Sequence, residues 1–179
     1  MASIKSKTTS KLIGEIQVPG DKSISHRALI FGACALGTTT ISNLLESEDV
    51  FSTLKALQKM GVKITKSQYD WKILGNGLGS LLGNNQTLNL GNSGTGARLL
   101  MGLVAGSDIR ITFTGDMSLS KRPMRRIIEP LQKFGMSFYP KNKSTLPLIV
   151  SGSQIPMPNE YDEKIGSAQI KSALINASL

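Results

Sequence analysis

Three short stretches of the chain combine glycine and serine with nearby cations, which is the composition of a turn that binds an anion. They read QVPGDKSISHR (17–27), NLGNSGTGAR (89–98) and EKIGSAQIK (163–171). Small residues let backbone N–H groups approach a ligand closely, and the N-terminus of a helix attracts negative charge. We therefore expect each stretch to open a helix and to bind phosphate or carboxylate, with Ser23, Ser93 and Ser167 as candidate N-caps. Ordinary capped helices with solvated cations are the alternative, and that explanation has to hold three times.

A second basic cluster lies in SLSKRPMRR (118–126), around the expected start of another helix. Pro123 suits the first helical position, where no N–H is needed. Arg122, just before that start, can bind an oxyanion with its planar guanidinium. Arg125 and Arg126 are expected to form a solvated face.

The overall charge points to anionic ligands. The chain has 21 basic and 12 acidic residues and a formal net charge of +9. Nucleic acid, an acidic membrane surface and small phosphorylated metabolites all suit that charge. No apolar run approaches the roughly 18 residues of a membrane span, and the N-terminus lacks the apolar core of a secretory signal. We expect a cytoplasmic location and no membrane partner.

Metal and nucleophile chemistry have little support in the sequence. His26 is the only histidine and Cys34 the only cysteine, so no metal-site spacing exists and an intrachain disulfide is excluded. A structural hydrogen bond is the favoured role for His26, and a buried, unreactive thiol is the favoured role for Cys34. The stretch GEIQVPGDKS does not have the spacing of a P-loop.

Hydrophobic periodicity predicts the elements that hold these stretches in place. They follow the order strand, helix, strand, helix, strand, strand, and that order then recurs. The first set comprises strand 13–18, helix 24–36, strand 38–42, helix 49–60 and strands 62–66 and 71–75. The second comprises strand 87–90, helix 94–106, strand 109–115, helix 122–134 and strands 136–140 and 146–150.

The letters of the sequence repeat as well, with a period of about 70 residues. LKALQKMGVKI and IEPLQKFGMSF share a helix end, a glycine (Gly61 and Gly135) and an immediate strand. Arg27, Arg98 and Lys171 occupy matching places in the first helix of successive units. We expect repeats at about 14–83, 84–156 and 157–179. A repeat unit cannot bury its apolar face alone, so the short third unit suggests a fragment or a remainder supplied by another chain.

Four segments carry a resemblance to a known family: PGDKSISHRAL, LGNSGTGARLLMG, TGDMSLSKRPMRRIIEPL and GSAQIKSALI. They resemble the signature segments of the 3-phosphoshikimate 1-carboxyvinyltransferase (EPSP synthase) family, occur in family order and span essentially the whole chain. Lys-Ser-x-Ser-His-Arg at 22–27 is the specific element. The sister family, UDP-N-acetylglucosamine enolpyruvyl transferase, has Lys-Asn at that turn and is disfavoured.

The resemblance implies a reaction and a fold. The family transfers the enolpyruvyl group of phosphoenolpyruvate to the 5-hydroxyl of shikimate 3-phosphate and releases phosphate, with no metal or organic cofactor. Its fold is α+β, an alpha-beta prism or inside-out α/β barrel, with two domains of three β-α-β-α-β-β units. Residues 1–13 then belong to the other domain, and residues 14–179 form an incomplete shikimate 3-phosphate-binding domain.

The resemblance also assigns roles to residues, while proton transfer falls to groups beyond the end of this chain. By resemblance, the chain alone is expected to be inactive or nearly so without that C-terminal portion. Gly94 leaves room for the inhibitor glyphosate, but Ser93 and Leu99 depart from many members, so sensitivity stays open. The implied ligand contacts are Lys22 and Gln169 with both substrates; Ser23, Arg27, Ser167 and Ala168 with shikimate 3-phosphate; Gly94 and Arg122 with phosphoenolpyruvate; and Asn92, Thr95 and a supporting Arg98 in the same loop.

A nucleic-acid-binding module is the rival from another class. It would use the net charge and the 118–126 cluster for phosphate contacts. Aromatic residues for base stacking are few and scattered, at Tyr69, Trp71, Phe138 and Tyr139. The cations also lie in glycine-rich turns, which suits small anions better, so no nucleic-acid partner is expected.

Overall fold

Two units of helices and small sheets follow one another along the chain, and a further helix packs against the second. The structure is a computed structural model that describes residues 3–83, 85–162 and 166–179. The first unit holds α1 (Lys22–Cys34), β1 (Leu36–Ser42), α2 (Glu48–Lys59), β2 (Lys63–Lys66) and β3 (Asp70–Asn76). The second holds β4 (Gln86–Asn89), α3 (Gly94–Ala105), β5 (Arg110–Thr114), α4 (Met117–Ser120), α5 (Arg125–Lys133), β6 (Ser137–Tyr139) and β7 (Leu148–Ser151), and α6 (Ala168–Ala177) follows.

The sheet topology repeats between the two units. The first sheet has the order β1-β3-β2 and the second the order β4-β5-β7-β6. In both, the strand after the first helix pairs antiparallel with the last strand of the unit, as in Thr39 opposite Ile73 and Ile111 opposite Val150. The second sheet differs by one strand, β4, which pairs parallel with β5. The second unit therefore has the β-α-β-α-β-β order with the short helix α4 added before α5, and the first unit has the same order without its opening strand.

The same helix ending occurs in both units, as the repeated glycines predict. Gly61 follows α2 with φ +89° and Gly135 follows α5 with φ +98°. The N–H of Val62 then bonds the carbonyl of Leu57 at 3.1 Å, and the N–H of Met136 bonds that of Leu131 at 3.4 Å. These are Schellman endings, which need a residue that accepts positive φ and which turn the chain directly into a strand.

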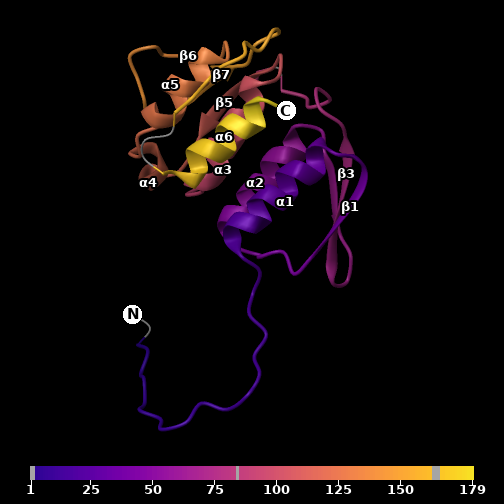
Figure 1. Cartoon of the computed structure of the whole chain (residues 1–179), viewed down its shortest axis with the longest axis vertical. Coiled ribbons are helices and arrows are strands. Elements are labelled where there is room, and N and C mark those ends of the chain that lie inside the picture. The colour runs from indigo at the N-terminus through magenta and orange to yellow at the C-terminus, as the bar shows by residue number, and fades with distance from the viewer. Residues whose placement is uncertain (1–2, 84, 163–165) are drawn as a thin grey trace.

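Helices occupy the middle of the molecule and the sheets lie outside them (Figure 1). α3 is apolar on nearly all sides because it packs against α6, α5, α2 and β7. Its Leu99, Leu100 and Met101 have no exposed surface. An α+β fold with central helices agrees with the predicted class, although the described residues form two open sheets and no closed barrel.

The strand predicted at 13–18 is wrong. These residues form no strand and are solvent-exposed, with Ile13 81% and Ile16 85% exposed, and Figure 1 shows the N-terminal segment extending away from the rest of the chain. A strand needs a neighbour to bond its N–H and C=O groups. No neighbouring strand pairs with this segment in the described chain, so its apolar alternation has no sheet to join.

Two helix starts also differ from expectation. Asp21, rather than Ser23, caps α1: its carboxylate accepts the N–H of Ile24 at 2.8 Å. α1 therefore starts before the predicted residue 24, and it stops at Cys34 because β1 begins at Leu36. α5 starts at Arg125, so Pro123 does not occupy its first position. The preceding residues form the short helix α4 instead, whose cap Asp116 accepts the N–H of Leu119 at 2.7 Å.

In the third unit, residues 157–162 and 166–179 are described. Its opening strand was expected in EKI at 163–165, which lies outside the described residues. Ser167 caps α6 as expected, accepting the N–H of Ile170 at 3.4 Å. Ser93 likewise caps α3, accepting the N–H of Gly96 at 3.1 Å.

Glycine lets α3 and α6 touch backbone to backbone. A Cβ on Gly102 would overlap the carbonyl group of Ala173, and one on Gly106 would lie 2.5 Å from the carbonyl oxygen of Ala177. Backbone atoms cannot swing aside as side chains do, so a side chain here would separate the two helices.

We expect Gly102→Ala to lower the free energy of unfolding by about 2 kcal/mol through this overlap. Gly32→Ala is the matched control: it is also a helical glycine, but its Cβ would meet the side-chain atom Ile73 Cδ1, at 2.8 Å, which can shift. Urea unfolding measures both. Equal midpoints for the two variants would contradict the close α3–α6 contact.

Candidate functional site

The starts of α1, α3 and α6 are joined by side-chain hydrogen bonds. Arg27 of α1 donates from Nη2 to Ser172 Oγ of α6 at 2.6 Å. Gln169 of α6 donates from Nε2 to Thr95 Oγ1 of α3 at 3.0 Å, and accepts at Oε1 from Arg98 Nη1 at 3.1 Å. Three segments about 70 residues apart in sequence thus meet at one end of the helix layer, as the three-turn hypothesis requires.

The α1 start presents two cations with different surroundings. Lys22 pairs with Asp49 of α2 at 3.0 Å between Nζ and Oδ2, and its side chain is 51% exposed. Arg27 is half-buried, and its Nη1 donates to the Ser23 carbonyl at 3.0 Å. Arg27 is therefore held in place, whereas Lys22 can reach a ligand in front of the helix by leaving Asp49.

Gly94 lies between two guanidinium groups at the start of α3. A Cβ there would lie 2.9 Å from Arg98 Nη1 and 3.0 Å from Arg122 Nη1. Arg122 also donates to Asn92 Oδ1, which links the 118–126 cluster to the glycine loop. The glycine therefore allows both cations to converge in front of the helix.

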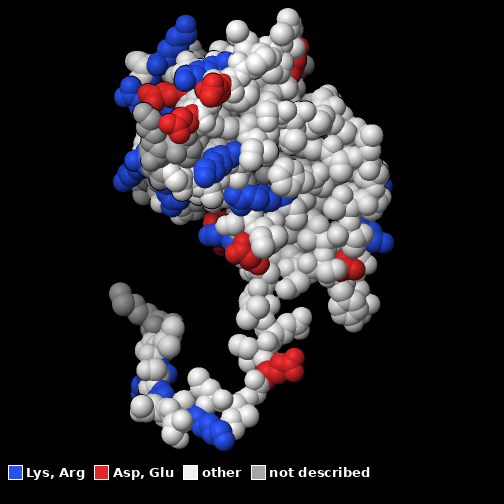
Figure 2. Space-filling view, in the orientation of Figure 1, with Lys and Arg blue, Asp and Glu red and all other residues white. Residues whose placement is uncertain are grey.

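Arg98, Arg122 and Arg126 form a cationic cluster. Burial, and then the charges of Arg122 and Arg126, lower the pKa of Arg98 below its usual value. No carboxylate forms a salt bridge with any of the three across residues 3–83, 85–162 and 166–179. Over the part of the molecule that holds α5 in Figure 1, Figure 2 shows several Lys and Arg side chains with Asp and Glu side chains among them. A cluster of this kind is stabilised by a bound anion.

A pocket of about 230 Å³ opens beside this cluster and the start of α6. Its walls include Arg98 and Arg126. Arg126 is solvent-exposed, as predicted, and it also borders this pocket. Ala168 is not part of the lining; its carbonyl accepts from Arg27 Nη2 at 3.5 Å. The pocket is lined by Arg98, Pro123, Arg126, Ile127, Ser167, Gln169 and Ile170.

His26 joins α1 to α2 from a fully buried position. Its Nδ1 lies 2.8 Å from Thr53 Oγ1, which agrees with the structural hydrogen bond expected for this residue. Its Nε2 is buried without a hydrogen-bond partner. Burial, opposed by Asp49 and reinforced by Lys22 and Arg27, lowers the pKa of His26 to about 4, so the ring is neutral at pH 7.

The sequence did not predict three residues that hold site residues in place: Asp49, Thr53 and Ser172. Asp49 and Thr53 lie on α2, which carries no glycine-rich turn, and Ser172 lies one turn inside α6. The helical period does place Asp49 and Thr53 four residues apart on one face. Nothing in the sequence indicates that this face meets Lys22 and His26.

Metal and membrane features are absent from the described part of the chain. No group of three His, Cys, Asp or Glu side chains is arranged there to hold a metal ion. No described helix is long and apolar enough to cross a membrane. Cys34 is half-buried, and burial raises the pKa of its thiol, which favours the unreactive protonated form.

Comparison with known proteins gives consistent matches over nearly the whole chain. The sequence model described as EPSP synthase (3-phosphoshikimate 1-carboxyvinyltransferase) matches residues 6–179. The curated 3-phosphoshikimate 1-carboxyvinyltransferases of Rhodopseudomonas palustris and Parvibaculum lavamentivorans are each 48% identical, over 98% and 99% of this chain, and 40% of each relative is covered. A solved EPSP synthase from Acinetobacter baumannii superimposes with a TM-score of 0.85 and 42% identity, over 92% of this chain and 37% of that one.

Stability should fall as the pH drops through the window set by His26. The unfolded chain takes up a proton near the ordinary histidine pKa of 6.5, while the folded chain resists protonation down to about pH 4. Above pH 6.5 the full stability is present; between 6.5 and 4 we expect a loss of about 3 kcal/mol, which levels off below 4.

Because His26 is the only histidine, its ring carbon resonance in NMR reports this pKa directly. His26→Asn, if folded, should flatten the stability curve over the same window. A ring that titrates near pH 6.5 in the folded chain would show that His26 is not held in a dry, neutral site.

Proposed function

The chain belongs to the EPSP synthase (3-phosphoshikimate 1-carboxyvinyltransferase) family, and from that membership we propose that it forms the shikimate 3-phosphate-binding part of such a transferase. The reaction moves the enolpyruvyl group of phosphoenolpyruvate to the 5-hydroxyl of shikimate 3-phosphate and releases phosphate. It belongs to the shikimate pathway, which leads to chorismate and the aromatic amino acids. We propose a cytoplasmic location, without a metal or organic cofactor.

The chain spans about 40% of the length of the curated relatives that it matches. We propose that residues 14–179 are an incomplete domain, in repeats of about 14–83, 84–156 and 157–179, and that residues 1–13 belong to a second domain. The exposed apolar side chains of the N-terminal segment, such as Ile4 at 97% and Leu12 at 89%, support this, because water is an unfavourable neighbour for them.

The observation that carries the proposal is the cluster of Arg98, Arg122 and Arg126, with no carboxylate partner among the described residues, beside three helix starts. Both substrates are polyanions, and each supplies the negative charge that this arrangement lacks. Charge-assisted bonds from guanidinium groups to phosphate or carboxylate are roughly twice as strong as neutral ones. Anionic groups also gain from the backbone N–H groups at helix N-termini.

We assign shikimate 3-phosphate to the side of the site formed by α1 and α6. Arg27 is oriented by Ser172 and the Ser23 carbonyl, so its guanidinium is preorganised and loses little freedom on binding. When the substrate binds, Lys22 leaves its ion pair with Asp49 and contacts the substrate instead. The proposed contacts on this side are Lys22, Ser23, Arg27, Ser167, Ala168 and Gln169.

We assign phosphoenolpyruvate to the glycine loop and Arg122. Gly94 leaves space between Arg98 and Arg122, and Asn92 holds Arg122 toward the loop. Thr95 and Gln169 form the bridge to the other substrate, through the bond between them. Glyphosate, which is also an anion, is proposed to compete in this space.

Acid–base catalysis needs a titratable group that can reach the reacting atoms. Around the described helix starts, Asp21 caps α1, Asp49 pairs with Lys22, and His26 is buried against Thr53. Asp21 and His26 are committed to structural contacts, and Asp49 is paired with Lys22 in the absence of substrate. We therefore propose that the proton-transfer groups lie in the remaining portion of the enzyme, and that these 179 residues bind substrate without turnover.

Two other functions compete with this one. A nucleic-acid-binding module would use the same cations, but Arg98 and Arg122 converge on Gly94, and Arg98 and Arg126 line a small pocket. UDP-N-acetylglucosamine enolpyruvyl transfer is disfavoured by Lys22-Ser23, and the matches carry the name of the shikimate enzyme.

We expect shikimate 3-phosphate to bind saturably and to shift the backbone amides at the starts of α1, α3 and α6. Lys22→Ala should weaken binding on the order of tenfold, because a charge-assisted contact is lost. Lys63→Ala, at an exposed lysine of β2, is the matched control. Isothermal titration at constant ionic strength, with a single-stranded oligonucleotide as competitor, measures the preference. Stronger binding of the oligonucleotide would favour the nucleic-acid module.

Turnover should appear only when the remaining portion of a family member is supplied. The release of phosphate from phosphoenolpyruvate and shikimate 3-phosphate measures it. With the complementing portion present, Arg122→Lys should lower activity at least tenfold, since lysine cannot reproduce the planar fork. Robust phosphate release by these 179 residues alone would overturn the assignment of proton transfer to the missing portion.

A further inference from the structure

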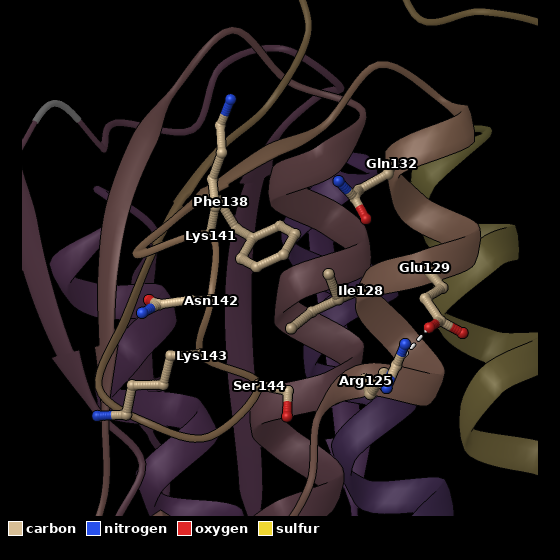
Figure 3. Close-up of a pocket in the computed structure, with 9 residues that line it drawn as sticks. All are labelled: Arg125, Ile128, Glu129, Gln132, Phe138, Lys141, Asn142, Lys143 and Ser144. Atoms are coloured by element: carbon tan, nitrogen blue, oxygen red, sulfur yellow. Dashed lines mark hydrogen bonds and ion pairs between the residues drawn. The ribbon is translucent and has the colours of Figure 1, made fainter.

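A second pocket lies on the outer side of α5, away from the starts of α1, α3 and α6. Figure 3 shows it between α5 and the loop that follows β6, with a volume of about 440 Å³, which is within the usual range for small-molecule sites. Arg125 lines this pocket, whereas its neighbour Arg126 lines the pocket beside Arg98. Nothing in the proposed transfer reaction uses it. It is lined by Arg125, Ile128, Glu129, Gln132, Phe138, Lys141, Asn142, Lys143 and Ser144.

The aromatic ring of Phe138 lies at the centre of the pocket and is only partly covered. In Figure 3 the Phe138 side chain lies between α5 and the loop, next to Ile128. Ile128 is 2% exposed and belongs to the core, while Phe138 is half-buried and packs against that core from one side. The other side of the ring is therefore available for a flat apolar group.

Positive charge surrounds this apolar floor. Glu129 is the only acidic residue in the lining, and it is already paired with Arg125, as the dashed line in Figure 3 marks. Neither Lys141 nor Lys143 has an acidic partner anywhere in the described chain. The lining thus keeps a net charge of +2 in need of an anion, and the amides of Gln132 and Asn142 add neutral hydrogen-bond donors.

The loop is anchored to the helix, so the pocket is preformed. The N–H of Met124, just before α5, donates to the carbonyl of Ser144 at 2.7 Å. Within the loop, the N–H of Lys143 donates to the carbonyl of Pro140 at 3.1 Å. The residue before the loop, Tyr139 at the end of β6, pairs with Ile149 of β7 in the sheet. A site whose backbone is fixed in advance loses less entropy on binding.

We propose that this α5–loop pocket binds a small anion that carries a flat apolar ring, such as an aryl phosphate. The ring stacks on Phe138 beside Ile128. The anionic group lies toward the loop, where Lys141 and Lys143 can turn to meet it. The ligand differs from both substrates of the proposed function, which carry no aromatic ring, and the pocket is separated from their site by α5.

Phenyl phosphate is the probe, and backbone amide shifts of the whole 179-residue chain locate its binding. We expect saturable shifts in residues 125–132 and 138–144. Lys141→Gln combined with Lys143→Gln should weaken binding on the order of tenfold, and Phe138→Leu should weaken phenyl phosphate but not inorganic phosphate. Lys133→Gln, an exposed lysine of α5 outside the lining, is the matched control and should change nothing.

The outcomes separate this pocket from the substrate site. Shifts confined to the starts of α1, α3 and α6 would assign the probe to the substrate site and overturn the proposal. So would equal affinity for inorganic phosphate and phenyl phosphate, or binding that the double lysine variant leaves unchanged. The lysine changes are on the surface, so they test the charge requirement even if Phe138→Leu perturbs the fold.

Discussion

The close contact between α3 and α6 is the constraint on which the site depends. Gly102 and Gly106 face the carbonyl groups of Ala173 and Ala177, so the two helix backbones approach as closely as packing allows. At that separation, side chains one turn from each helix start can bond across the interface, as Gln169 does with Thr95 and Arg98. A wider spacing would leave the same residues to water and the three helix starts apart.

The packing of α5 against α3 has an electrostatic consequence. Arg98 lies close to Arg122 and Arg126, and burial, followed by the charges of these two residues, lowers the pKa of Arg98. The fold tolerates the cluster because neutral acceptors hold it: the carbonyls of Gly94 and Pro123, and the side chains of Asn92 and Gln169. Neutral acceptors orient guanidinium groups without cancelling their charge, which leaves the cluster free to attract an anion. An acidic partner would have oriented them equally well and removed that attraction.

Internal repetition explains why the fold was largely predictable. The helix endings at Gly61 and Gly135 are local, since a glycine at positive φ closes a Schellman motif wherever its neighbours are. The strand pairs follow from short connections within each unit. Residues 13–18 show the limit of such reasoning: they have the alternation of a strand, but a strand is completed by its neighbour. The predicted start of α1 was wrong for a similar reason. Asp21 and Ser23 are both good caps, and only the path of the chain selects Asp21.

The sequence by itself determined most of the order of elements and the helix caps at Ser93 and Ser167, because small residues at helix starts act through the local backbone. It also predicted an anionic ligand. Only the tertiary structure decided which side chains meet. The packing of α2, α5 and α6 decides these contacts: Asp49 pairs with Lys22, Thr53 bonds His26, Ser172 bonds Arg27, and Arg126 borders the pocket beside Arg98. Those contacts join residues far apart in the chain, and their partners follow from helix separation and rotation, which no local pattern of letters specifies.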